Sequence, residues 1–415
     1  MVLIYNLGIR IYLLLIWLVS PVNPKAKSWL AGRRGLLDEV ELLAQNNDPK
    51  IWVHCSSLGE FEQGRPLIER IRESYPTLKV VLTFFSPSGY KVRKNYSGAD
   101  YIFYLPLDTK RNAKRFVEAV KPKMAIFVKY EFWYHFLSEL HAREIPTYLI
   151  SANFRETQIF FKPYGRWYRK FLSHFTHIFV QNHLSLELLN SVGIKEVTVT
   201  GDTRFDRVSR VASESATIPL LDTFCDGEKV IVAGSTWPKD EELLLNYLSA
   251  NADRVKMIIA PHEISPSRVG SIVSASKVEA ICFTRPEGTS PKQARLLVLD
   301  TIGFLSSTYR YGCLAYIGGG FGAGIHNTLE AAVFGIPVVF GPNYLKFQEA
   351  MDLIALGAGF SIKSQAELND LLDRLLNDPT LLSQAGESAG AYVKSGVGSS
   401  EKILSIISNR LNKML

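Results

Sequence analysis

The sequence lacks the signatures of several protein classes. Only 4 of its 415 residues are cysteines, and none has the CxxC or CxxH spacing of a zinc site or a pattern that indicates a disulfide framework. It contains no histidine cluster and no Asp-x-Asp pair, so we expect no bound metal and no other cofactor. It also has no internal repeat and no low-complexity tract, which argues against repeat, fibrous and disordered proteins.

Charge and length narrow the class further. The 47 Lys and Arg outnumber the 40 Asp and Glu, and the formal net charge of +7 favours an anionic partner: nucleic acid, an acidic membrane surface or a phosphorylated substrate. Nucleic acid is the weakest of these, because the basic residues are spread along the chain and are not interleaved with aromatic residues in a stripe. A content of 47% hydrophobic and 21% charged residues is typical of a globular protein, and this length suits two domains.

One long apolar run opens the chain. Residues 1–19 are apolar or aromatic except for Asn6 and Arg10, and the run approaches the roughly 20 residues that cross a bilayer. We therefore predict a membrane anchor at residues 1–20 that either spans the bilayer or lies within one leaflet. The basic residues between 25 and 34 favour a cytoplasmic location for the domain after the anchor. A cleaved signal peptide is the alternative, but Pro21 and Pro24 stand where its cleavage site belongs.

After the anchor, short β-rich runs alternate with helical patterns. We predict strands at 51–55, 80–84, 124–128, 147–150, 177–180 and 196–199, and again at 230–233, 256–260, 279–283, 294–299, 313–317 and 337–340. Strands that alternate with helices form parallel sheets covered on both faces, so the sequence predicts an α/β fold with two Rossmann-like, doubly wound domains that face a cleft. The expected parts are the anchor at 1–20, an N-terminal domain at 21–208, a linker at 209–228, a C-terminal domain at 229–395, and a C-terminal helix at 396–415 that can cross back to the first domain.

The most distinctive motif is the glycine-rich stretch at residues 316–330. A predicted strand ends at Ile317, glycines come next, and we expect a helix to begin at Asn327 and Thr328. Glycines let backbone N–H groups approach an anion and a helix N-terminus favours negative charge, so the motif predicts a phosphate cradle. Glu330 is expected to reach the hydroxyls of a ribose. A plain chain reversal is the alternative.

Three charged residues come within a few positions of the ends of predicted strands. Glu60 comes after the first strand near a helix N-terminus, where it suits a general base that takes a proton from an attacking alcohol; a first-turn glutamate that complements the helix dipole is equally compatible with this position. Glu131 precedes two aromatic residues, a mixture that suits sugar or lipid contact, or else packing with Glu131 paired to a cation. Arg204 can offset negative charge in a cleft, although a surface ion pair is the commoner role.

The ordered set of motifs resembles that of the bacterial Kdo transferases, which attach 3-deoxy-D-manno-octulosonic acid (Kdo) to the lipid A precursor. The resemblance covers essentially the whole chain. It includes the anchor with Arg33-Arg34-Gly35, Ser57-Leu58-Gly59-Glu60, Ser86-Pro87-Ser88-Gly89, Glu131-Phe132-Trp133, residues 201–206, Gly234-Ser235-Thr236, residues 300–303, and His326-Asn327-Thr328-Leu329-Glu330.

This resemblance implies an inverting glycosyltransferase of the GT-B fold that acts in lipopolysaccharide biosynthesis. The implied donor is CMP-Kdo and the implied acceptor is the acylated lipid A precursor, lipid IVA, at the cytoplasmic side of the inner membrane in contact with anionic lipid. Glu60 matches the family's proton acceptor, and Glu131 and Arg204 match positions assigned to transition-state stabilisation. The matches to CMP contacts are Pro261, His262, Gly303, Phe304, Leu305, Asn327, Thr328, Leu329 and Glu330.

The chain departs from the family pattern in three places. Pro261-His262-Glu263 stands where Pro-Arg-His is common, Phe304 replaces a glutamate, and Arg204 replaces a lysine. Two other interpretations remain open at this point: a GT-B transferase that uses a UDP-sugar, and a membrane-tethered nucleotide- or lipid-binding protein without activity.

Overall fold

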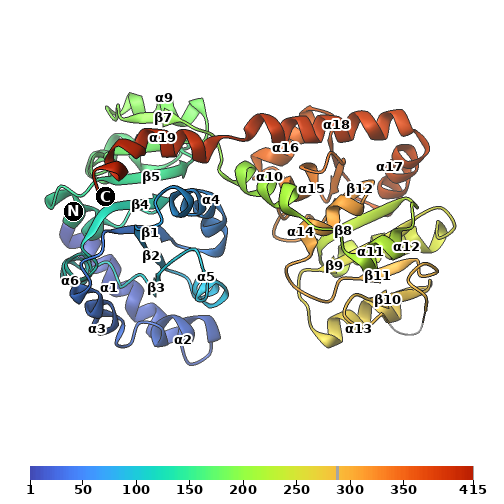
Figure 1. The fold of residues 1–415 in the computed structure, drawn as a ribbon, viewed down its shortest axis with the longest axis horizontal. Helices are drawn as coiled ribbons and strands as arrows, with labels where there is room; N and C mark the ends of the chain where they lie inside the picture. The colour runs from blue at the N-terminus through green and yellow to red at the C-terminus, as the bar shows by residue number, and fades with distance from the viewer. Residues whose placement is uncertain (287–288, 415) are drawn as a thin grey trace. The chain divides into compact units, whose positions relative to one another are not determined.

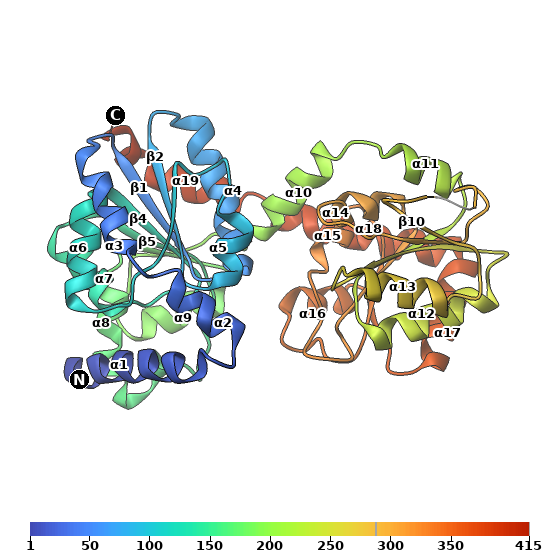
Figure 2. The ribbon, with the colours of Figure 1, turned by 90° about the horizontal axis from the view of Figure 1, so that it is seen from below.

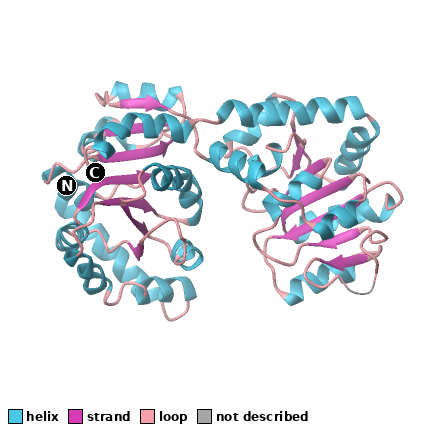
Figure 3. Cartoon of the chain, viewed as in Figure 1, coloured by secondary structure: helices cyan, strands magenta, loops and turns pink. Residues whose placement is uncertain are grey.

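The chain folds into two compact units, shown in Figure 1. The computed structural model describes residues 1–286 and 289–414. Unit 1 comprises Met1–Arg207 and Gly398–Leu415, and unit 2 comprises Val208–Val397. Each unit holds one seven-stranded parallel sheet with helices on both faces (Figure 3), which confirms the predicted α/β, Rossmann-like class.

The sheet of unit 1 has the order β3-β2-β1-β4-β5-β6-β7. Its strands are β1 (Lys50–Cys55), β2 (Lys79–Phe84), β3 (Tyr101–Tyr104), β4 (Pro122–Val128), β5 (Thr147–Ala152), β6 (His177–Val180) and β7 (Val197–Val199). The chain moves outward from β1 to β3 and then returns to β4 on the other side of β1. The point between β1 and β4 is therefore the switch point, where open α/β sheets bind ligands at the carboxyl ends of their strands.

The sheet of unit 2 repeats this plan with the order β10-β11-β9-β8-β12-β13-β14. Its strands are β8 (Val230–Thr236), β9 (Lys256–Pro261), β10 (Ala280–Cys282), β11 (Leu296–Val298), β12 (Leu314–Ile317), β13 (Val338–Phe340) and β14 (Gly359–Ser361). The switch point here lies between β8 and β12, and the glycine-rich motif begins directly after β12.

The helices of unit 1 include one from the far end of the sequence. They are α1 (Val2–Val19), α2 (Pro24–Ala31), α3 (Leu36–Glu41), α4 (Leu58–Ser74), α5 (Pro87–Arg93), α6 (Lys110–Val120), α7 (Tyr134–Ala142), α8 (Arg169–Ser173), α9 (His183–Ser191) and α19 (Ser399–Asn412), with short 3-10 turns at Leu42–Gln45, Ile159–Phe161 and Pro163–Trp167. α19 packs beside α4, where Ile403 and Ile407 join the core around β1 and the Tyr75 hydroxyl donates to Asn412 Oδ1 at 3.0 Å. Of the predicted C-terminal helix, residue 415 lies outside the described residues.

The helices of unit 2 begin within the segment expected as a linker. They are α11 (Pro219–Cys225), α12 (Pro238–Ala250), α13 (Pro266–Ala275), α14 (Leu305–Thr308), α15 (Leu329–Ala332), α16 (Gln348–Ala355), α17 (Gln365–Asn377) and α18 (Pro379–Gly396), with a 3-10 turn at Tyr309–Tyr311, while α10 (Arg204–Glu214) runs from unit 1 into unit 2. Residues 209–228 thus contain the end of α10 and all of α11.

The apolar helix α1 lies along unit 1, as Figure 2 shows. The Tyr5 hydroxyl donates to the buried carboxylate of Asp108, and Asn6 Oδ1 lies 2.6 Å from His135 Nε2. The opposite face is open: Leu3 is 83% exposed. By length and composition, α1 is the one helix within residues 1–286 and 289–414 that could cross a membrane, with a mean hydropathy of 2.1.

Three elements differ from the sequence prediction. β3 and β14 were not predicted; they are short, of four and three residues, and lie at sheet edges, where β3 pairs only with β2 and β14 only with β13. The helix expected from Asn327 is the four-residue α15, which begins at Leu329. Its start is delayed because Asn327 Oδ1 accepts the N–H of Leu329 at 3.1 Å, a local turn that replaces the first helical turn.

Candidate active site

Two glutamates lie at the switch point of the unit 1 sheet. Glu60 is in the first turn of α4, directly after β1, and Glu131 comes shortly after β4. β1 and β4 are neighbours in register, with His54 opposite Phe127, so their carboxyl ends meet at one edge. The sequence-predicted carboxylates are thus on adjacent strand ends, where a ligand of this fold binds.

The backbone around Glu60 explains its position. Ser57 caps α4: the Glu60 N–H donates to Ser57 Oγ at 3.4 Å, and the Ser57 N–H donates to Glu60 Oε2 at 3.1 Å. This is a capping box, so Glu60 does complement the helix start, as the alternative interpretation held. The same contacts hold the carboxylate at the sheet edge, so the structural role and a chemical role are compatible.

The surroundings of Glu60 favour its protonated form. Burial, and next the negative charge of Glu131, raise the pKa of Glu60 to about 8, while the Ser56 and Ser57 N–H groups and the Lys129 ammonium act in the opposite direction. A carboxyl group with a pKa near neutrality is suited to accept a proton in a reaction.

Glu131 is buried and doubly held. It is 6% exposed, and its Oε2 lies 3.0 Å from His54 Nε2 and accepts the Trp133 Nε1–H at 2.5 Å. The partners of Glu131 are therefore a histidine and an indole. Sequence reasoning missed His54, because it lies inside β1 among apolar residues and nothing in its local pattern distinguishes it from a core histidine.

The network continues behind His54. His54 Nδ1 lies 2.8 Å from Thr83 Oγ1 on the neighbouring strand β2, and the Trp52 Nε1–H donates to the same oxygen at 2.8 Å. Trp52, His54 and Thr83 are each 0% exposed. A line of polar groups thus runs through the sheet to Glu131.

Arg204 is held in an ion pair. Its Nε and a terminal nitrogen lie 2.9 and 2.8 Å from Asp202 Oδ2, and its N–H donates to Asp202 Oδ1 at 2.9 Å. The preceding Thr203 hydroxyl donates to the carbonyl of Gln63 at 2.5 Å, which places this segment against α4 one turn beyond Glu60. The cation is thus near the acidic edge of the sheet, already compensated by Asp202.

Non-glycine residues with positive φ occur at both edges of the sheets. Lys129 follows β4 with φ 70°, Ser151 lies within β5 with φ 53°, and Ser235 lies near the end of β8 with φ 55°. Lys121, Glu144 and Asp226 precede β4, β5 and β8 with φ 49°, 56° and 42°, so this strain, which costs about 1–3 kcal/mol per residue, does not by itself distinguish the glutamate edge from the opposite one.

In unit 2 the glycine loop closes around a buried carboxylate. The Gly319 N–H and the Trp237 N–H donate to Asp240 Oδ2 at 2.9 Å each, and the Tyr316 hydroxyl donates to Asp240 Oδ1 at 2.8 Å. Gly319 itself has φ 92°, and a Cβ on Gly318 would lie 2.2 Å from the Ser235 carbonyl oxygen, so the glycines permit this close packing. The Gly319 amide that the cradle prediction offered to a phosphate is therefore occupied by Asp240.

A hollow of about 550 Å³ lies beside this loop, lined by residues that include Trp237, Phe321 and His326. His262 stacks between Trp237 and His326, with ring centroids 4.7 and 4.6 Å apart. Burial, and next the nearby His262, lower the pKa of His326. The predicted His262 therefore belongs to a row of three rings at the end of β9 and not to an isolated structural position.

The remaining predicted donor residues lie at one edge of the unit 2 sheet, where the carboxyl ends of its parallel strands lie. Glu330 joins two of the loops, since its Oε2 accepts the Ser306 hydroxyl at 2.6 Å and its Oε1 accepts the Asn327 amide at 3.1 Å. The Thr328 hydroxyl is buried and has no partner among the described residues. Their positions lie at or after the ends of β9 (Pro261, His262), β11 (Gly303, Phe304, Leu305) and β12 (Asn327, Thr328, Leu329, Glu330).

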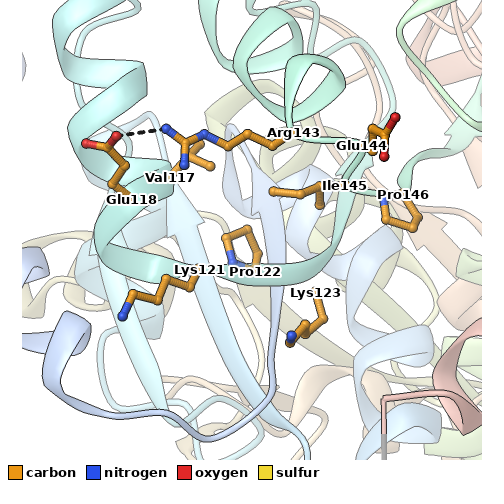
Figure 4. Close-up of a pocket in the computed structure, with 9 residues that line it drawn as sticks. All are labelled: Val117, Glu118, Lys121, Pro122, Lys123, Arg143, Glu144, Ile145 and Pro146. Atoms are coloured by element: carbon orange, nitrogen blue, oxygen red, sulfur yellow. Dashed lines mark hydrogen bonds and ion pairs between the residues drawn. The ribbon is translucent and has the colours of Figure 1, made fainter.

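A larger hollow in unit 1 lies elsewhere (Figure 4). It measures about 680 Å³ and is lined from Val117 to Lys123 and from Arg143 to Pro146. These residues precede or begin β4 and β5, at the amino ends of the strands and so at the edge opposite the two glutamates. Its Glu118 and Arg143 form an ion pair with each other at 2.9 Å, and we assign this hollow no part in the chemistry.

Comparison with known proteins shows similarity to one family of transferases. Residues 30–207 match the family model of 3-deoxy-D-manno-octulosonic-acid transferases. The chain is 29% identical to the 3-deoxy-D-manno-octulosonic acid transferase of Aquifex aeolicus over 79% of this chain and 86% of that protein. It is 24% identical to the Haemophilus influenzae protein of the same name, over 96% of this chain and 95% of that one.

A solved structure with a similar fold is that of the UDP-GlcNAc 2-epimerase from Neisseria meningitidis bound to UDP-GlcNAc. It has a TM-score of 0.60 at 17% identity, and the match covers 88% of this chain and 100% of that chain. Together with the two parallel sheets, this similarity shows the GT-B class of fold.

Proposed function

Because the chain belongs to the 3-deoxy-D-manno-octulosonic-acid transferase family and is thus a glycosyltransferase, we propose that it transfers Kdo from CMP-Kdo to the lipid A precursor during lipopolysaccharide biosynthesis. The observation that carries the proposal is the similarity to named transferases over 79% and 96% of the chain. The matched segment at residues 30–207 contains the paired carboxylates of the unit 1 switch point.

In the proposed reaction, Glu60 is the general base. Its ionised carboxylate takes the proton of the acceptor hydroxyl while the hydroxyl oxygen bonds to the anomeric carbon of Kdo. The bond from that carbon to the CMP phosphate oxygen breaks, and CMP leaves with the electron pair. Direct displacement of this kind inverts the anomeric configuration, and a positioned base contributes about 10²- to 10⁴-fold in rate.

We assign charge stabilisation to Glu131 and Arg204. The Glu131 carboxylate favours the positive charge that builds on the sugar ring, and the Arg204 guanidinium favours the negative charge that builds on the leaving phosphate. The geometry supports fixed groups in both cases: Glu131 is held by His54 and Trp133, and Arg204 is oriented by Asp202.

We assign acceptor binding to unit 1 and CMP-Kdo binding to unit 2. The proposed CMP contacts lie at or after the carboxyl ends of β9 and β11, on one side of β8, and of β12, which borders the switch point; they are Pro261, His262, Gly303–Leu305 and Asn327–Glu330. That edge is where nucleotides bind in this class of fold.

We further propose that α1 holds the protein at the inner membrane, with both units on the cytoplasmic side. Its exposed apolar residues support contact with lipid, and the basic residues between 25 and 34 favour anionic headgroups. The acceptor is itself a lipid, so an enzyme at the membrane surface meets it there.

The proposal is tested by the mass of the product. The purified full-length chain, given CMP-Kdo and the lipid A precursor, is expected to form a product heavier by whole Kdo residues, with inverted anomeric configuration by NMR. Glu60→Gln is expected to bind CMP-Kdo but to form product about 10²- to 10⁴-fold more slowly, whereas Glu62→Gln, two residues away and with Glu62 paired to Arg93, keeps activity. A product formed only from a UDP-sugar would replace this proposal with the UDP-sugar alternative.

A further inference from the structure

The buried side of Glu131 carries a hydrogen-bond network that the transfer mechanism does not use. We propose that His54 and Thr83 are positioning residues that, together with Trp133, fix the direction of the Glu131 carboxylate, so that Glu131 and Glu60 act as a coupled pair. This inference rests on the proposed function for its kinetic consequence, but the coupling itself is a property of the folded unit.

The network begins at a group that can only donate. The Trp52 indole N–H donates to Thr83 Oγ1 at 2.8 Å. Thr83 Oγ1 also lies 2.8 Å from His54 Nδ1, so the hydroxyl joins the indole to the imidazole.

The network ends at a carboxylate, whose oxygens accept hydrogen bonds, so the hydrogen between His54 and Glu131 is placed on His54 Nε2, 3.0 Å from Glu131 Oε2. The Trp133 N–H lies closer to Oε2, at 2.5 Å, than to His54 Nε2, at 3.2 Å. Two donors therefore converge on one carboxylate oxygen and fix its position.

The network is shielded from solvent, because Trp52, His54 and Thr83 are each 0% exposed. The line also ends in an indole N–H, which does not release a proton at any physiological pH. The network therefore positions and polarises Glu131 and does not relay protons.

The charge on Glu131 acts on Glu60. The groups that face Glu60 are Glu131 and Lys129 at the end of β4, Tyr130 between them, and Cys55 at the end of β1. Among these, the negative charge of Glu131 disfavours an ionised Glu60. Loss of the His54 donor leaves the Glu131 carboxylate free to turn away from Glu60, so its charge raises the pKa of Glu60 less and Glu60 releases its proton at lower pH.

The test uses His54→Leu, with His177→Leu as its matched control. His177 lies in the same sheet and its Nε2 is also close to a threonine hydroxyl, that of Thr198 at 2.9 Å. We expect His54→Leu to lower kcat at least tenfold and to move the acid limb of the pH profile downward by about one pH unit. His177→Leu should change neither, and His54→Gln, which keeps a side-chain N–H, should recover part of both.

A readout independent of turnover separates this inference from the proposed function. In protein labelled with ¹³C at glutamate carboxyls, the signal absent from Glu60→Gln reports the titration of Glu60, and its midpoint should fall in His54→Leu. An unchanged midpoint would overturn the inference even if the enzyme transfers Kdo as proposed. If the wild type makes no product and the midpoint still falls, only the proposed function is refuted.

Trp133→Phe covers the case in which His54→Leu does not fold. It removes the other donor to Glu131 while keeping a ring against Phe85, whose centroid lies 4.7 Å from that of Trp133. The Glu60 midpoint should move in the same downward direction, and a midpoint equal to that of the wild type would count against the network.

Discussion

The pH dependence of transfer is the most direct consequence of the Glu60 environment. A general base acts only when ionised, and burial together with Glu131 raises the pKa of Glu60 to about 8. Roughly 3% of Glu60 is then ionised at pH 6.5 and about 75% at pH 8.5, so kcat/KM should rise about 25-fold between these values and level off above pH 9.

The assay measures initial rates of product formation by mass spectrometry between pH 6 and 9.5, in detergent-dispersed acceptor, with subsaturating CMP-Kdo. Glu62→Gln should show the same acid limb as the wild type. Glu60→Gln should show a rate lower by about 10²- to 10⁴-fold without that limb. A wild-type profile that is flat from pH 6.5 to 8.5, or a Glu60→Gln enzyme that keeps the limb, would refute the assignment of Glu60 as the titrating base.

Three further predictions concern stability. The pKa of Glu60 in the folded state lies above its unfolded value of about 4.5, so the folded state binds the extra proton and the free energy of unfolding of the wild type falls as pH rises from about 4.5 to 8. Glu60→Gln lacks this loss and should be more stable than the wild type at pH 9 by a few kcal/mol, measured by urea unfolding with fluorescence detection. Tyr5→Phe removes the hydroxyl that donates to the buried Asp108 and should lower the free energy of unfolding by about 1–3 kcal/mol. Tyr12→Phe keeps the ring that stacks on Phe85 and should lower it little. Equal melting temperatures of the two variants would show that Tyr5 does not hold α1 against unit 1. Asp240→Ala leaves the Gly319 and Trp237 N–H groups and the Tyr316 hydroxyl without their acceptor. It should lower the free energy of unfolding by about 3 kcal/mol and weaken CMP binding measured by calorimetry, while replacement of the exposed Glu242 by Ala should do neither. Undiminished CMP binding by Asp240→Ala would show that the glycine loop does not bind the nucleotide.

The sheets could be predicted from the sequence because their strands are buried on both faces. A run such as Ile51 to Cys55 is continuously apolar or aromatic apart from His54, and glycine, proline or serine residues bound many such runs. The positions of Glu60 and Glu131 at the sheet edge could be predicted for the same reason, since each comes shortly after such a run. The edge strands β3 and β14 were missed although the edge strands β7 and β10 were predicted, because a run of three or four residues is too short for its local pattern to decide between strand and loop.

The partners of the predicted residues could not be obtained from local pattern. His54 and Thr83 are 29 positions apart and meet only because β1 and β2 pair in register, with His54 opposite Thr83. Asp240 is equally hidden: it looks like an ordinary acidic residue in a first helical turn, yet it fills the glycine loop 79 positions later. Such contacts depend on strand order, which the sequence of one strand does not specify.

The return of α19 to unit 1 sets the order of events during synthesis. The helix that covers α4 and β1 is made after the whole of unit 2, so the sheet that carries Glu60 has an uncovered apolar flank until α19 has been synthesised. Unit 2 is thus an insertion in unit 1, and we expect a chain that stops before α19 to lose more stability in unit 1 than in unit 2.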